Sequence, residues 1–397
     1  MDLFVLGASV VMLVAIYSVR LSSRLALPSL LLYLLMGVAL GEDGVGIHFD
    51  NAEAAHALGF AALALILAEG GLTTNWRELR KTIRVGSWMA TGGVVISVAV
   101  MTLAMHYVLG FGWHASMLIG AITSPTDAAA VFSVLRVVRV PRRIRAALEA
   151  ESGLNDAPTV VLVALISEGG ISHHSWYGVV GIIVAELLGG LAIGWIVGIA
   201  GSAAIKRIAL PSVSLYPLAL LTVAALSYSG AAVLHASGFA AIYVTSLVLG
   251  NTSVPNHEEA QDFAESIAWV AQIGLFVMLG LLLSPNTLTW RIVGEALLGG
   301  LFLTFLARPM AVLSGSLVKR MNWRDMTFLS WAGLRGAVPI VLATIPLAAD
   351  FPDALRIFDI VFVMTVIYTI LTAPTLPFVA RKLDLITPVA RSAMAPD

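Results

Sequence analysis

The chain consists of long apolar runs separated by short polar connections, and apolar and polar positions do not alternate over any long stretch. Unbroken apolar runs are typical of membrane-spanning helices, which need about 20 residues to cross the hydrocarbon core, whereas alternation would favour a transmembrane β-barrel. We predict thirteen helical spans. They cover approximately residues 3–20, 28–41, 54–73, 85–109, 113–135, 146–167, 175–204, 211–234, 236–250, 266–283, 290–318, 325–348 and 356–379.

Composition supports a bilayer as the solvent. Hydrophobic residues make up 59% of the 397 positions and charged residues only 12%, with a mean hydropathy of +0.92. Soluble proteins are about 25% charged, so this chain could not cover a water-facing surface. The net charge of −1 provides no basic field for nucleic acid, and the absence of cysteine excludes disulfides and thiolate chemistry. We therefore expect one all-α, polytopic membrane domain over residues 1–397, in contact with lipid and without nucleic-acid partners.

The basic residues indicate the orientation, because loops on the cytoplasmic side carry an excess of Lys and Arg. With the N-terminus outside, nineteen of the 23 Lys and Arg residues fall in inner loops, and the outer loops carry Arg291 and Arg356. The inner residues are Arg20, Arg24, Arg77, Arg80, Lys81, Arg84, Arg136, Arg139, Arg142, Arg143, Arg145, Lys206, Arg207, Lys319, Arg320, Arg324, Arg381, Lys382 and Arg391. We expect a multi-pass protein of the cell membrane with its N-terminus outside and its C-terminus cytoplasmic.

Five ionisable residues fall inside predicted spans, where a charge is costly and usually functional. They are Glu69, Asp127, Glu151, Asp156 and Arg335. Glu186 and Arg308 lie nearer span ends or beside a proline, and snorkelling or helix packing would explain them.

The first cluster is Thr123-Ser124-Pro125-Thr126-Asp127 in the fifth span. Proline inside a helix frees a carbonyl, and carbonyl and threonine oxygens suit a hard monovalent cation. The alternative is a simple proline kink, with Asp127 as the N-cap of the half-helix that follows. Both are compatible with function, because helix breaks at membrane depth are tolerated beside protein or a cavity.

The second cluster, residues 151–158 (ESGLNDAP), lies in the sixth span. Ser152 and Asp156 are four residues apart and share one helix face, while Glu151 and Asn155 share the neighbouring face. Two carboxylates, an amide and a hydroxyl thus converge in lipid. Interhelical hydrogen bonding is the alternative, but such bonds contribute only about 0.6 kcal/mol on average.

The third cluster, residues 333–339 (GLRGAVP), interrupts the twelfth span with Gly and Pro. Arg335 cannot lose its proton, so it needs a carboxylate or an aqueous cavity. We expect Glu151 to be its partner in a core ion pair, and Glu69 to line the ion pathway or to form hydrogen bonds within the core.

The positions of the two breaks predict a transporter. Interrupted spans at corresponding places in two halves mark the binding site of secondary transporters. The fifth and twelfth spans correspond if repeats of six flank a linking seventh helix, and an odd linker makes the repeats inverted in topology. A small-residue face in that linker, Gly190, Gly194 and Gly198, predicts close helix packing.

These motifs resemble the monovalent cation:proton antiporter family of NhaP/NHE type, and the similarity covers nearly the whole chain. They are Thr126-Asp127, residues 151–156 and residues 330–339 (SWAGLRGAVP). The details look most similar to bacterial potassium/proton antiporters of the cell-volume-regulation subgroup. The resemblance implies an NhaA-like fold with two crossing interrupted helices, and a homodimer. It also implies a moving core bundle (residues 85–170 and 290–380), interface helices (1–84 and 205–283) and a linker helix (171–204).

The resemblance also implies roles for individual residues. Asp156 would bind the monovalent cation and the proton in turn, with Ser152 as a cation ligand. Thr126 and Asp127 would lie where the unwound helices cross, and Asp127 would neutralise the helix ends. Asn155 stands where electrogenic relatives have a second Asp, and Thr123 would belong to the pathway.

The expected function is therefore alternating-access exchange of K⁺ or Na⁺ for H⁺, without enzymatic activity or a cofactor, for pH, cation and volume homeostasis. One titrating carboxylate predicts electroneutral one-for-one exchange. The subgroup commonly carries a cytosolic regulatory domain after the membrane part, and with the chain ending at Asp397 we expect that domain to be absent. Two alternatives stay open on the residues alone: an intramembrane aspartyl protease using Asp127 and Asp156, and a cation channel.

Overall fold

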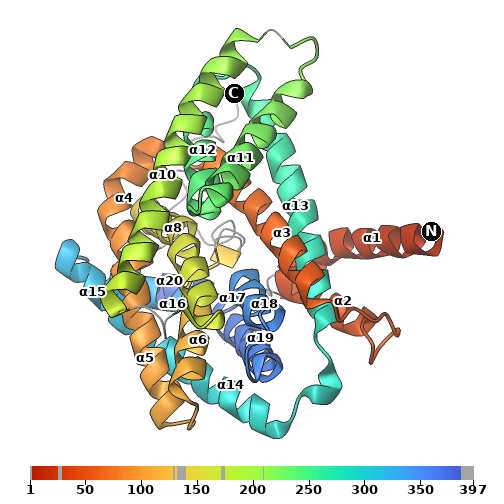
Figure 1. Ribbon diagram of the computed structural model, residues 1–397, viewed down its shortest axis with the longest axis vertical. Coiled ribbons are helices and arrows are strands. Elements are labelled where there is room, and N and C mark those ends of the chain that lie inside the picture. Colours follow the sequence, from red (N-terminus) through yellow and green to blue (C-terminus); the bar gives the residue numbers. More distant parts are fainter. Residues whose placement is uncertain are drawn as a thin grey trace, which may run out of the picture.

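The computed structural model describes residues 2–25, 29–127, 130–131, 140–170, 175–208 and 210–385, and within these ranges it contains helices and no strands (Figure 1). The α-helices are α1 (Asp2–Leu25), α2 (Ser29–Leu40), α3 (Ala52–Thr73), α4 (Trp76–Trp88), α5 (Val94–Tyr107), α6 (Trp113–Thr123), α8 (Arg142–Ser167), α10 (Trp176–Arg207), α11 (Leu215–Val233), α12 (Gly238–Gly250), α13 (His257–Leu282), α14 (Trp290–Phe302), α15 (Arg308–Val318), α16 (Trp323–Trp331), α17 (Ala337–Leu342), α18 (Thr344–Ala348), α19 (Ala354–Thr372) and α20 (Leu376–Lys382).

Every predicted span overlaps at least one of these helices, and the all-α membrane fold is confirmed. Among the described residues, seven helical segments are long and apolar enough to cross a bilayer, and four apolar helices are shorter. The shorter ones include α2 and α12, the spans whose predicted lengths already fell below a full crossing. The end of the fifth predicted span, at residues 128–129 and 132–135, lies outside the described residues.

Several helices begin where a polar side chain caps free backbone N–H groups. The side chains of Asn51, Asn75 and Asn322 accept hydrogen bonds from the first turns of α3, α4 and α16, and Ser237 and Thr289 do the same for α12 and α14. The first-turn N–H groups have no partner within the helix, so these short polar residues stabilise the chosen starts.

Two helices are broken at membrane depth, as the sequence predicts. Helix α6 ends at Thr123, before the non-helical residues 124–127, and α16 ends at Trp331, with five residues between it and the start of α17. The two breaks meet, because the backbone N–H of Asp127 donates to the carbonyl oxygen of Leu334 at 3.0 Å. An exposed pair of such breaks would leave backbone groups unsatisfied in lipid, and the crossing satisfies part of them.

The neighbouring spans carry a second matched feature that the sequence did not reveal. A five-residue π-helical segment, η1 (Met89–Gly93), joins α4 to α5, and another, η3 (Leu303–Ala307), joins α14 to α15. The two segments lie in the fourth and eleventh spans, which correspond under the inverted repeat. They pack against the partner repeat, η1 on α15 and η3 on α5, and π-helical turns are frequent at functional sites.

Two groups of helices are visible in the packing. Helix α12 packs against α3, α10 and α11, and α13 packs against α2 and α3. Helix α4 packs against α8, α5 against α6, and α14 against α19, with the short helices α16–α18 in the centre of the view in Figure 1. The predicted close packing of the Gly190, Gly194 and Gly198 face is confirmed, since a Cβ at Gly194 would lie 3.0 Å from Cα of Ala241 on α12.

Candidate functional site

The crossing of the broken helices places the carboxylate of Asp127 between two half-helices. Its Oδ1 accepts a hydrogen bond from the backbone N–H of Ala130 at 3.2 Å, and its Oδ2 faces the N–H of Val338, the second residue of α17, at 3.5 Å. Asp127 is 2% exposed. A negative charge beside backbone N–H groups at the start of a helix offsets the positive end of its dipole, which is compatible with the N-cap alternative and with the expected position at the crossing.

Gly336 makes that approach possible. A Cβ at this position would collide with the carboxylate of Asp127, so the close contact between the two breaks requires glycine.

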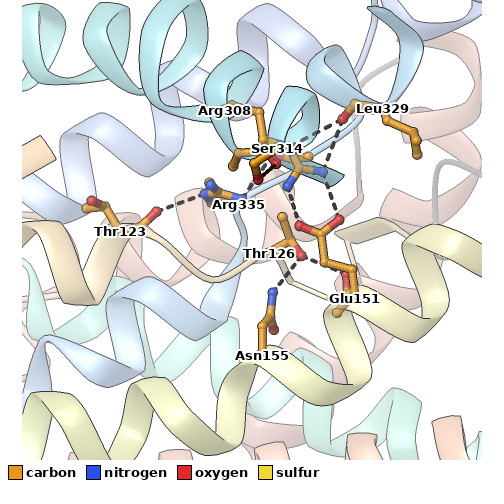
Figure 2. Close-up of polar contacts among 11 residues, drawn as sticks. Thr123, Thr126, Glu151, Asn155, Arg308, Ser314, Leu329 and Arg335 are labelled. Carbon is orange, nitrogen blue, oxygen red and sulfur yellow. Dashed lines mark hydrogen bonds and ion pairs between the residues drawn. The ribbon is translucent and has the colours of Figure 1, made fainter. Parts of the chain in front are cut away.

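The polar face of α8 lies against the same crossing. The Thr126 hydroxyl is 2.9 Å from the Ser152 hydroxyl and accepts a hydrogen bond from Nδ2 of Asn155 at 2.8 Å (Figure 2). Asp156 is next to Asn155 and 3% exposed, and its Oδ1 has no hydrogen-bond partner among the described residues. The Oδ1 of Asn155 is also without a partner. The structure thus brings together Thr126, Ser152, Asn155 and Asp156, with two buried oxygens left unsatisfied.

The predicted partner of Glu151 is wrong. Its carboxylate forms a two-pronged ion pair with Arg308, in which Nη1 contacts Oε1 and Nη2 lies 2.9 Å from Oε2 (Figure 2). Arg308 also donates to the carbonyl oxygen of Leu329, from Nε at 3.3 Å and from Nη2 at 3.1 Å. Both ion-pair partners are buried, at 2% exposure each. Arg308 directly follows η3, which aims it at the core instead of the membrane surface.

Arg335 is buried as well but takes a different position. Its Nε donates to the carbonyl oxygen of Thr123 at 2.9 Å and its Nη1 to that of Gly333 at 3.3 Å, so it binds the free carbonyls at the ends of the two broken helices. Its own carbonyl accepts a hydrogen bond from the Thr369 hydroxyl at 2.6 Å. Arg335 lies within electrostatic range of Glu151 without a hydrogen bond to it. Arg335 is therefore a positive charge that binds backbone carbonyl oxygens at the crossing. Asp127 is the corresponding negative charge, which binds backbone N–H groups there.

The two predicted pathway residues lie outside this hydrogen-bonded cluster. The Thr123 hydroxyl donates to the Ile119 carbonyl of its own helix at 2.7 Å, and only its carbonyl reaches the crossing. Glu69 is half-buried on α3, which packs against α12 and α13.

A bidentate ion pair joins α8 to the first half of the second broken helix. Arg143 donates from Nε and Nη2 to the carboxylate of Asp325 at 2.9 and 3.0 Å. The Asp325 carboxylate raises the pKa of Arg143, which is mostly exposed at the start of α8. This contact holds two core elements together at the water-facing end.

A second polar cluster, which the sequence did not lead us to predict, lies at one end of α14 and α19. Glu295 accepts hydrogen bonds from Arg291 at 2.9 Å and Arg356 at 2.5 Å, and Asp359 accepts one from Thr287 at 3.0 Å. These arginines, Asp359 and Thr287 line a cavity of about 320 Å³. The i,i+4 spacing of Arg291 and Glu295 was the one sequence signal for this cluster.

The donors at the crossing are hydroxyl, amide and carboxylate oxygens, which suit monovalent hard cations. Among the described residues, no three His, Asp or Glu side chains are grouped closely enough to hold a metal ion with ligands of that kind. A buried carboxylate with one unsatisfied oxygen can bind a proton or a small cation, and each neutralises it.

Comparisons with known proteins agree with this chemistry. A family model described as the transmembrane sodium/hydrogen exchanger matches residues 9–382. The K(+)/H(+) antiporter NhaP of Alkalimonas amylolytica is 34% identical over 393 residues, which cover 98% of this chain and 68% of that protein. The K(+)/H(+) antiporter NhaP2 of Shewanella oneidensis is 34% identical over 407 residues, covering 98% and 69%.

The fold matches a solved structure, that of the sodium proton antiporter MjNhaP1 from Methanocaldococcus jannaschii. The TM-score is 0.82 at 23% sequence identity, and the match covers 96% of this chain and 99% of the other. The family model and the two antiporters carry the assignment of the family, and the solved structure carries the fold. The chain therefore belongs to the sodium/hydrogen exchanger family of membrane transporters.

Proposed function

We propose that this protein exchanges a monovalent cation for a proton across the cell membrane, and that both bind in turn at Asp156. The observation that carries this proposal is the buried Asp156 carboxylate, whose Oδ1 lacks a partner beside the crossing of two broken helices. An uncompensated carboxylate at membrane depth is costly, so it is occupied by a proton or by a cation. Thr126, Ser152 and Asn155 supply the neighbouring oxygen groups.

Exchange follows if only the neutralised site can change its exposure. A bare Asp156 would carry an unpaired charge through a low-dielectric barrier, so the empty site stays trapped on one side. A proton leaving on one face must then be replaced by a cation before the return. Because Asn155 does not titrate, Asp156 is the one carboxylate that exchanges a proton for a cation in each cycle. We therefore propose electroneutral one-for-one exchange.

The charges at the crossing keep fixed roles in this scheme. Asp127 and Arg335 stabilise the half-helix ends, and Glu151 with Arg308 forms an internally neutral pair. None of these four groups changes charge during the cycle. This assignment favours a transporter over an aspartyl protease, whose two carboxylates share one proton, since Asp127 is engaged with backbone N–H groups.

Alternating access requires one group of helices to move against another. We propose that residues 85–170 and 290–380 form the moving core, that residues 1–84 and 205–283 form the interface, and that 171–204 link them. Helix α4 runs without a break across residue 84 and packs against α8, so we extend the core to Trp76. Asp156 on α8 then lies near the boundary with α3 and α12.

We further propose a homodimer with the N-terminus outside and the C-terminus cytoplasmic. The apolar outer faces of α1 and α11, with exposed Leu13, Tyr17 and Leu226, are available to a second copy or to lipid. Potassium is the proposed physiological cation, because two relatives that are 34% identical to this chain are named K(+)/H(+) antiporters, and sodium is the second candidate.

The test is flux in proteoliposomes with a trapped pH dye and a preset pH gradient. K⁺, Na⁺, Li⁺ and Rb⁺ are added in turn, with choline as the control. Antiport predicts cation-dependent dissipation of the gradient without a change in membrane potential. A potential that develops with the flux would contradict the one-for-one stoichiometry, and no cation dependence would contradict antiport.

A further inference from the structure

Helix α8 carries a second carboxylate on the face of Asp156. Glu149 precedes Asp156 by seven residues, which is two turns, so the two side chains share a helix face about 10 Å apart along the axis. Glu149 lies between Asp156 and the water-facing start of α8, where exposed Arg142 pairs with Glu78 of α4 at 3.2 Å. A cation or proton that enters from this end reaches the level of Glu149 before that of Asp156.

The structure shows no hydrogen bond or ion pair that would explain Glu149. It is half-buried and forms neither a hydrogen bond nor an ion pair with any described residue. The charged and titratable groups that face it are Arg145 on its own helix, Glu78 on α4 and Tyr243 on α12. A half-buried carboxylate without a hydrogen bond or an ion pair is costly, and a bound cation or proton would remove that cost.

Tyr243 separates the two carboxylates. Its ring packs on Gly153, midway between Glu149 and Asp156, and a Cβ there would lie 2.8 Å from the ring and 3.0 Å from the hydroxyl. Tyr243 is 4% exposed, and its hydroxyl lies beside the Thr74 side chain without meeting the geometry of a full hydrogen bond. Buried polar groups are normally satisfied, so this hydroxyl is free to interact with water or an ion beside it.

Three polar side chains follow one line between α8 and α12, two helices that pack against each other. From the water-facing end this line passes Glu149, then Tyr243, which lies within electrostatic range of Glu149, and reaches the unsatisfied Oδ1 of Asp156. If the proposed division of the helices holds, this line is the boundary between the moving core and the interface.

We propose that Glu149 is a second monovalent-cation and proton site, which receives both particles from the cytoplasmic side and exchanges them with Asp156 past Tyr243. This inference rests on the proposed antiport. The inference adds a second binding site to the antiporter. It also adds a barrier between the two sites, which the side chain of Tyr243 forms. The occupant of Glu149 is the transported cation or a proton, since each neutralises the carboxylate.

The first experiment measures the half-saturating cation concentration separately on the two faces, in vesicles of defined orientation. Glu149→Gln removes one negative charge about 10 Å from Asp156. With an effective permittivity between 80 and 20, the half-saturating concentration on the face of Glu149 should rise between about 2-fold and about 15-fold, and the opposite face should be unchanged. Glu258→Gln, an exposed carboxylate at the start of α13, is the matched control and should have no effect.

The outcomes separate this inference from the antiport itself. Equal values for Glu149→Gln and Glu258→Gln, with normal exchange, would overturn the second site and leave antiport intact. A change of equal size on both faces would also overturn it, because it would indicate a general distortion. Absence of exchange in the unmodified protein would instead contradict the proposed function. Glu149→Asp, which keeps the charge, should restore the normal half-saturation.

The second experiment tests the role of the Tyr243 hydroxyl in the passage between the two sites. Tyr243→Phe keeps the ring on Gly153 and removes only the hydroxyl, so the maximal exchange rate should fall while the thermal stability in detergent stays unchanged. An unaltered maximal rate would show that the hydroxyl does not take part in the passage and would contradict the path proposed here.

Discussion

The buried Glu151–Arg308 pair offers a direct test of the core geometry. Arg308→Met removes both guanidinium contacts and leaves Glu151 as an uncompensated carboxylate in a site where both residues are 2% exposed. Breaking one partner of a buried pair costs about 3–5 kcal/mol. We expect Arg308→Met and Glu151→Met each to lower the free energy of unfolding by an amount in this range.

The double variant should recover most of that loss. Replacing both members of a buried pair by apolar residues of similar size is often neutral or stabilising by about 1–4 kcal/mol. Glu151→Met with Arg308→Met should therefore show a coupling energy nearly as large as the sum of the two single effects. Glu151→Met with Arg335→Met should show a smaller coupling, because Arg335 donates to backbone carbonyls and has no hydrogen bond to the carboxylate.

The assay is unfolding in mixed micelles by titration with a denaturing detergent, followed by the fluorescence of the nine tryptophans. Free energies of the four members of each cycle give the two coupling energies. Additive effects for Glu151 and Arg308, or a larger coupling for Glu151 and Arg335, would refute the observed pairing. The unmodified protein and an exposed control, Glu258→Met, define the baseline.

Three further outcomes follow from the site. Thr126→Val, which removes the hydroxyl joining two polar side chains of α8, should lower stability by about 0.5–1.5 kcal/mol in the same unfolding assay and raise the half-saturating cation concentration. Gly336→Ala should abolish exchange in proteoliposomes, because the added Cβ would displace the carboxylate of Asp127; wild-type rates would contradict the close contact. Arg143→Ala should cost only about 0.2–1 kcal/mol because the side chain is exposed, and should leave exchange intact. Asp325 raises the pKa of Arg143, so this contribution is complete below the ordinary arginine pKa and is lost only as pH rises through the raised value; the difference from the unmodified protein should stay constant across neutral pH.

Much of the fold could be predicted because each span must satisfy its backbone within lipid. The apolar runs located the helices, and proline with glycine located both breaks, as at Pro125 and Gly336. The shared faces of Ser152 with Asp156 and of Glu151 with Asn155 followed from their spacing on one helix, whereas only the family resemblance implied the position of Asp127 at the crossing. These inferences depend on the lengths of apolar runs, on proline and glycine, and on residue spacing within one helix, all of which can be read from a single sequence.

The partner of Glu151 could not be predicted in the same way. Arg308 and Arg335 are both deep in apolar spans, and spacing along the chain does not say which of two distant helices faces the carboxylate. The π-helical turn before Arg308 rotates the following helix, and it has no clear sequence signal. Arg308 next to Pro309 was taken to be a packing or snorkelling residue, although a cation of full charge in a 29-residue apolar helix required a buried anion.

The most direct test of the proposed mechanism is cation-driven dissipation of a pH gradient by Asp156→Asn in proteoliposomes, beside the unmodified protein. The substituted amide cannot exchange a proton for a cation, so the account predicts no cation-dependent flux from a protein that elutes and unfolds like the original. Exchange at the wild-type rate in Asp156→Asn would contradict the central claim that both substrates bind at this carboxylate.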